Sequence, residues 1–124
     1  MSAHDAITYR WDDLPVDRPM PLIDRRRIMG DRMMISHVTL HEGFVVPTHV
    51  HHNEQFAVIL SGRIRFTIGD ASTGGTHERT LTGGEVLHLP SNVPHGAEAL
   101  ETTVVLDLFS PPDEKTGVDT SASS

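Results

Sequence analysis

The sequence predicts a single all-β domain, built as a sandwich or barrel of about eight short strands. Its 124 residues, with a mass of 13.6 kDa, are enough for one hydrophobic core. Apolar residues recur mostly at every second position, which is the period of a strand with one buried face. Ten glycines and eight prolines supply many turns. No segment combines helix-capping residues with a sustained helical period.

Turn residues separate the expected strands. In chain order, these strands are residues 27–29, 33–41, 45–51, 55–60, 63–68, 85–89 and 102–109. Gly30 and Asp31 are typical of a hairpin turn between the first two strands. Residues 69–80 are rich in Gly, Ser and Thr and are expected to form a loop, and residues 90–94 form a turn. The Ser-Pro-Pro segment at 110–112 ends the last strand, because proline cannot continue a β-ladder.

The chain is expected to divide into three parts. Residues 1–24 form an N-terminal arm, residues 25–112 form the barrel, and residues 113–124 form a small, polar, flexible tail. Trp11 and the proline-rich stretch 14–22 can pack on the barrel or on a second subunit, and we expect a homodimer. The three arginines at 25–27 are interpreted as one strand segment with two side chains outward and one inward.

Charge and composition exclude several classes of protein. Ten basic and 17 acidic side chains give a net charge of −7, which argues against a nucleic-acid partner. The longest apolar run, residues 56–60, is too short to cross a membrane. Residues 1–12 lack the features of a signal peptide, so a cytoplasmic location is expected. The absence of cysteine excludes disulfides and thiolate catalysis. A small-molecule substrate is the expected partner.

The nine histidines include a pair that points to metal chemistry. His49 and His51 are two residues apart on an expected strand, so both side chains face the same way. Neutral imidazoles are ligands for Zn, Cu, Fe and Ni. A polar turn follows, and then Gln55 opens the next strand, which ends at Gly62. A second segment, from Gly84 to His95, likewise begins with a glycine, and a proline-containing turn at 90–94 precedes its histidine.

These two segments resemble, in order, the two motifs of the cupin superfamily. The positions that match are Gly43, His49, His51, Gly62, Gly84, Pro90 and His95. Gln55 stands where the first motif has an acidic residue, while Asn92 and Ala99 replace a glycine and an asparagine of the second motif. Asparagine tolerates left-handed backbone angles, so Asn92 can still make its turn. The resemblance implies a jelly-roll barrel, the double-stranded β-helix.

By this resemblance His49, His51, Gln55 and His95 are the ligands of one divalent metal ion. Zinc is the expected metal, with nickel, iron or manganese as alternatives. Because Gln55 is a neutral ligand, the positive charge of the metal is not compensated. We therefore expect Lewis-acid chemistry in preference to oxygenase chemistry.

The arrangement is most similar to two kinds of small single-domain cupin. One kind comprises cyclases of aromatic polyketide biosynthesis, and the other opens the ring of unsaturated uronates in pectin and alginate breakdown. In this subgroup an arginine that can hold a substrate carboxylate commonly follows the proline segment, but here that place is Asp113. This difference favours polyketide cyclisation over uronate ring opening. A non-catalytic ligand-binding cupin and a dioxygenase are further alternatives.

Three more residues are candidates for the site. Asp107 lies in an apolar strand, where a carboxylate is costly unless it is paired or used. It is either a general base near the metal, or a partner of Arg63 or Arg65, or a group that orients a ligand histidine. Phe109 shares its face and is a candidate pocket wall. His37 is a candidate pocket residue, and it shares a face with His41.

Overall fold

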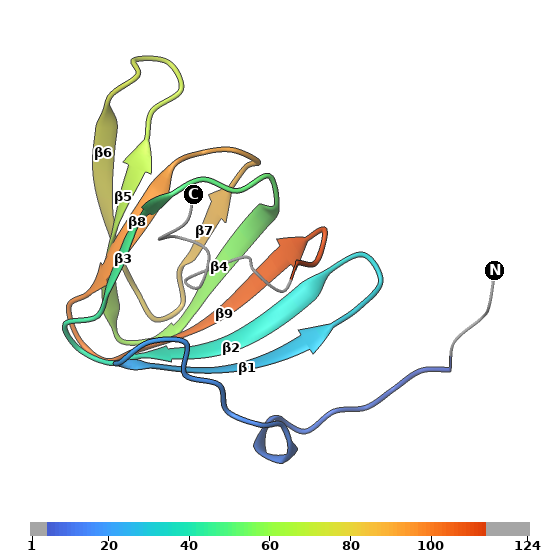
Figure 1. Ribbon diagram of the computed structural model, residues 1–124. Helices are drawn as coiled ribbons and strands as arrows, with labels where there is room; N and C mark the ends of the chain where they lie inside the picture. The colour runs from blue at the N-terminus through green and yellow to red at the C-terminus, as the bar shows by residue number, and fades with distance from the viewer. Residues whose placement is uncertain (1–4, 114–124) are drawn as a thin grey trace.

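A computed structural model of the chain describes residues 5–113. Two antiparallel sheets form a jelly roll that is almost entirely β-structure (Figure 1). The elements are a 3-10 turn η1 (Trp11–Asp13) and the strands β1 (Ile23–Met29), β2 (Met34–Leu40), β3 (Val45–His49), β4 (Glu54–Ser61), β5 (Arg63–Gly69), β6 (Thr76–Thr82), β7 (Val86–Leu89), β8 (His95–Ala99) and β9 (Thr103–Ser110). The predicted fold class is therefore confirmed.

The two sheets bring distant parts of the chain together. The five-stranded sheet has the order β1-β2-β9-β4-β7, so the last strand lies between β2 and β4. The four-stranded sheet has the order β3-β8-β5-β6. Each cupin-like motif therefore contributes one strand to each sheet. The first motif supplies β3 to the four-stranded sheet and β4 to the five-stranded sheet, and the second motif supplies β8 and β7 in the same way. The inner faces of both sheets meet in one core.

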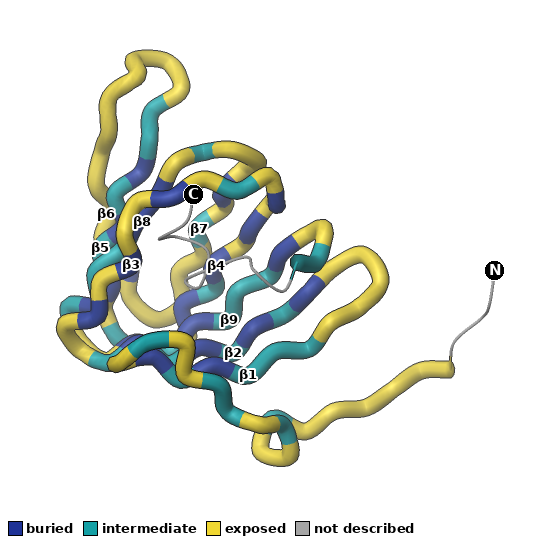
Figure 2. Tube along the Cα trace, viewed as in Figure 1, coloured by how far each residue is buried: buried dark blue, intermediate teal, exposed yellow. Residues whose placement is uncertain are grey.

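Strand alternation decides which residues enter that core. Along β2 every second residue is buried, from Met34 through Ser36 and Val38 to Leu40. Figure 2 shows the same alternation of buried and less buried positions along the five-stranded sheet. The core is mostly aliphatic, which gives the barrel a rigid wall.

Backbone geometry explains two of the motif residues. Gly62 has a φ of 92°, and a Cβ atom there would lie 2.4 Å from the carbonyl oxygen of Thr102. Only glycine fits this close approach. Asn92 has a φ of 65°, so it makes the left-handed turn that was expected of it.

The strand boundaries differ from the prediction in three places. β1 begins at Ile23, two residues before Arg25, where the first strand segment was expected to begin. β6 occupies Thr76–Thr82, most of which was expected to be loop. All but one of its residues are exposed, so the strand carries no apolar alternation. β8, at His95–Ala99, is a short strand that glycine and alanine make hard to recognise.

The N-terminal arm packs on the barrel from Trp11 onward. The Trp11 ring lies 5.2 Å from the ring of His37 on the outer face of β2. Farther along, Asp17 forms an isolated β-bridge with Arg25. Residues 5–10 lead away from the barrel (Figure 1). The expected flexible tail lies outside the described residues, except for Asp113. In the described part of the chain, no helix has the length and apolar character needed to span a membrane.

Candidate metal centre

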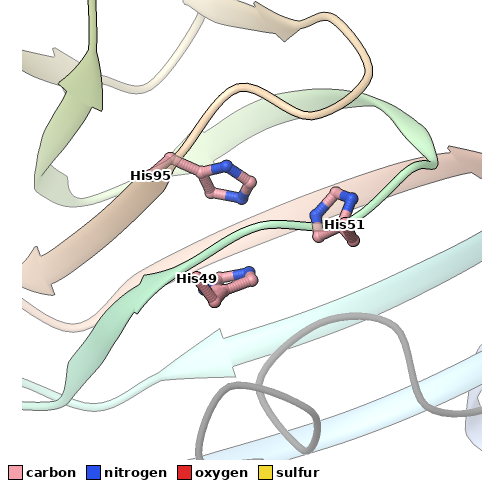
Figure 3. Close-up of side chains that lie close together, drawn as sticks. All are labelled: His49, His51 and His95. Carbon is pink, nitrogen blue, oxygen red and sulfur yellow. The ribbon is translucent and has the colours of Figure 1, made fainter. Parts of the chain in front are cut away.

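Three histidines from the two motifs converge inside the barrel (Figure 3). His49 ends β3, His95 begins β8, and the two residues are partners in the ladder. His51 follows β3 by two residues. One ring nitrogen of each histidine lies within 4.8 Å of the other two nitrogens. His49 and His95 are buried, and His51 is half-buried.

A backbone carbonyl fixes the tautomer of each ring. Nδ1 of His49 lies 2.9 Å from the oxygen of Pro47, Nδ1 of His51 lies 3.0 Å from the oxygen of Asn53, and Nδ1 of His95 lies 2.9 Å from the oxygen of Val93. A carbonyl oxygen only accepts, so each Nδ1 carries the proton. Each Nε2 then keeps its lone pair for a metal.

The environment of the rings fits a bound cation. Nε2 of His51 is buried and has no hydrogen-bond partner, which is costly for a polar atom unless a ligand satisfies it. Burial lowers the pKa of His95 to about 4, and it also lowers the pKa of His51. Both rings are therefore neutral at physiological pH, as metal ligation requires. These residues fit a divalent metal ion.

Gln55 faces the same cavity from the opposite sheet. It lies near the start of β4, is 7% exposed, and lines the cavity together with His49 and His95. Its Nε2 donates to Oδ1 of Asp107 at 2.8 Å. Because a carboxylate accepts hydrogen bonds, this contact orients the amide so that its oxygen is available to another partner. An amide oxygen so placed can serve as a neutral fourth ligand.

Asp107 is the carboxylate of the cavity. It pairs in register with Ser36 of β2, which places both residues on the inner face. Burial raises the pKa of Asp107 from 3.8 to about 6, against the effect of the Gln55 hydrogen bond, which lowers it. The two arginines considered as partners pair elsewhere, Arg63 with Glu101 and Arg65 with Glu98. Asp107 therefore contacts Gln55, which is a candidate ligand.

The raised pKa of Asp107 predicts a pH-dependent gain in stability for Asp107→Asn in the metal-free protein. The folded state holds the carboxyl proton more tightly than the unfolded state, so stability falls as pH rises from 3.8 to about 6. Asparagine still accepts from Gln55 but carries no charge. Each pH unit is worth about 1.4 kcal/mol, so at pH 7.5 we expect a gain of roughly 1–3 kcal/mol.

Denaturant unfolding of both metal-free proteins at pH 7.5 and pH 4 measures this difference. The gain should disappear at pH 4, where the carboxyl is largely protonated in the folded state. An equal change in stability at both pH values would contradict the assignment.

The rest of the cavity is largely apolar. Phe109 is buried in its wall, and its ring lies 5.8 Å from that of His51. Residues from both sheets complete the wall, and they include Ile23, Val38, Val46, Ile64, Phe66 and Val105. Such a lining keeps bulk water away from the polar groups and strengthens their electrostatic effects.

Two other predicted side chains lie outside the cavity. His37 is on the opposite face of β2 from Ser36 and Val38, which line the cavity. It contacts Trp11 instead, so the prediction that His37 is a pocket residue is wrong. His41 lies just after β2, with its Nε2 3.0 Å from Oδ2 of Asp24.

Arg25 also lines the cavity, a position that the sequence pattern did not predict. Arg25 and Arg27 pair in register with Val38 and Ser36 on the inner face, whereas Arg26 pairs with His37 on the outer face. Two of the three arginines therefore point inward, the reverse of the prediction. Starting the strand at Ile23 and counting every second residue would have found this arrangement.

Comparison with known proteins agrees with this architecture. The solved structure of KdgF from Halomonas sp. has a TM-score of 0.80 and 24% identity, covering 91% of this chain and 100% of the other. An RmlC-like cupin from Shewanella frigidimarina has a TM-score of 0.75 and 20% identity, with coverages of 94% and 97%.

Oxalate decarboxylase from Bacillus subtilis, described with Mn(II) centres, has a TM-score of 0.77 and 20% identity. The match covers 91% of this chain but only 33% of the decarboxylase. A search of curated proteins gives no match. A family model described as "Cupin domain" matches residues 36–109, more than half of the chain. The chain belongs to the cupin family.

Proposed function

We propose that this cupin is a metal-dependent, non-redox enzyme that cyclises a carbonyl-rich small molecule of the aromatic polyketide type. The observation that carries the proposal is the contact between Gln55 and Asp107. It joins a neutral candidate ligand to a carboxylate in the same cavity as His49 and His95. One arrangement thus supplies both a cation site without anionic ligands and a group that can accept a proton.

Four residues would hold the metal. His49, His51 and His95 would supply three nitrogen ligands, and Gln55 would add an oxygen. This donor set suits zinc, with nickel, iron and manganese as alternatives. A bound divalent ion would act as a Lewis acid toward a carbonyl oxygen of the substrate.

The chain's own side chains supply the remaining steps. Asp107 would accept a proton from the carbon next to the substrate carbonyl, as a general base. The Gln55 amide holds one oxygen of this carboxylate at 2.8 Å, which fixes its orientation. The protonated Asp107 would return its proton after the ring closes. Phe109 and its apolar neighbours hold the folded substrate and exclude water.

A turnover assay under nitrogen tests this proposal. The tag-free protein, loaded with zinc, is incubated with a linear poly-β-ketone that ends in a free carboxylate. Liquid chromatography with mass spectrometry should detect a cyclised product that free zinc does not form at the same rate. The same protein is also incubated with a 4,5-unsaturated galacturonate.

Each other outcome contradicts cyclisation. A requirement for O₂ would identify a dioxygenase, and turnover of the uronate alone would identify a ring-opening enzyme. Binding without turnover of either probe would identify a ligand-binding cupin. The homodimer and the cytoplasmic location remain predictions.

A further inference from the structure

Arg25 places a fixed positive charge in the wall of the cavity. Its side chain is on the inner face of β1 and is only 4% exposed. It lines the same cavity as His49, Gln55, His95 and Asp107. A guanidinium remains protonated in any protein environment, so the cavity contains a permanent cation besides any bound metal.

Asp17 of the N-terminal arm holds Arg25 in position. Its Oδ2 lies 2.7 Å from Nη2 of Arg25 and 3.3 Å from Nη2 of Arg27. Backbone hydrogen bonds of 2.7 and 2.9 Å also link Asp17 and Arg25 in both directions. The guanidinium is therefore preorganised, and little conformational entropy would be lost when it binds a ligand.

Arg25 is buried but the side chain of Asp17 is 40% exposed, and an ion pair with one exposed partner contributes little net stability. The stability of the fold therefore does not explain why an arginine lies in this wall. On the inner face, the neighbours of Arg27 across the sheet are the polar residues Ser36 and Asp107, whereas Arg25 lies beside Val38 and Val105. Much of the remaining wall is apolar. The cavity is thus suited to a molecule with a hydrophobic body and a charged end.

We propose that Arg25 binds a carboxylate of the substrate, through charge-assisted hydrogen bonds from its guanidinium. The proposal rests on the proposed function only in taking this cavity as the substrate site. Arg25 would then take the part of the carboxylate-binding arginine whose place Asp113 occupies in this chain. The carboxylate would contact Arg25 on β1, and the rest of the molecule would extend toward the histidines.

Benzoate and benzamide are matched probes for this site, since they share a shape and differ in charge. Each is titrated by NMR into the zinc-loaded protein and into the metal-site variant His49→Ala with His51→Ala. We expect benzoate to bind more tightly than benzamide in both proteins. Preference for benzoate in the zinc-loaded protein alone would place the carboxylate on the metal. That result would overturn the role of Arg25 and leave the proposed function intact.

Three variants test Arg25 directly. Arg25→Gln should weaken benzoate binding about tenfold or more, the range for a lost charge-assisted hydrogen bond, and leave benzamide unchanged. Asp17→Asn should instead strengthen benzoate binding, because the asparagine oxygen can still accept from Arg25 and hold it in place, while the competing negative charge is removed. Arg26→Gln, on the outer face of the same strand, is the control and should change neither.

Asp17→Asn also keeps the proposal testable if Arg25→Gln does not fold. If Arg25 has only a structural role, Asp17→Asn should lower the stability of the protein without changing its affinity for benzoate. That result, or a folded Arg25→Gln protein that still prefers benzoate over benzamide, would overturn the proposal.

Discussion

Asp107→Asn is expected to lower turnover of the poly-β-ketone probe about 100-fold or more, which is the usual contribution of a general base. Asparagine has nearly the same shape and still accepts the Gln55 hydrogen bond, but it cannot take a proton at neutral pH. The metal content should stay at the level of the unaltered protein. Steady-state kinetics, with metal analysis of the same samples, measures both quantities.

Glu98→Gln is a matched control for this substitution. Glu98 is also a strand carboxylate, but it pairs with Arg65 at 2.7 Å and does not line the cavity. Its substitution should leave turnover unchanged. Full activity of Asp107→Asn would contradict the role of Asp107 as a base. A parallel loss of metal and turnover would show that Asp107 acts only by positioning Gln55.

Much of the fold could be predicted from the sequence, because one buried face leaves a period of two in the residues. The strands of the five-stranded sheet carry this pattern clearly, and β2 alternates along its whole length. β6 could not be recognised, since it is an almost fully exposed edge strand whose partner β5 supplies the apolar residues. A strand that is stabilised mainly by hydrogen bonds to a neighbouring strand has no apolar pattern of its own from which it could be predicted.

The pairing of His49 and His51 on one face could be predicted from their spacing, and His95 was implied by the resemblance to cupins, but the direction of several other side chains could not be predicted. A period of two shows which residues share a face without showing which face is inside. His37 was therefore expected in the pocket, although Ser36 and Val38 occupy it. Arg25 was missed because three consecutive arginines, at 25–27, leave no apolar alternation to show which of them face inward. The carbonyl partners of the three Nδ1 atoms depend on turns that only the folded chain defines.

The largest expected effect concerns the metal site itself. His49→Ala combined with His51→Ala removes two of the three converging nitrogen ligands. Even outer partners of a ligand change metal affinity by about 10–100-fold, so the loss here should exceed about 100-fold. The barrel should remain folded, because the aliphatic core between the sheets does not include these two residues. Circular dichroism and denaturant unfolding check that the double variant is folded.

Zinc titration by calorimetry, with elemental analysis of the tag-free protein, tests this centre most directly. The unaltered chain should bind one ion per chain, and the His49→Ala, His51→Ala variant should bind none with comparable affinity. His37→Ala with His41→Ala is the matched control, since it also removes two histidines but leaves the converging three intact. This control should still bind one ion per chain. Full zinc occupancy in the folded His49→Ala, His51→Ala variant would contradict the assignment of the metal centre.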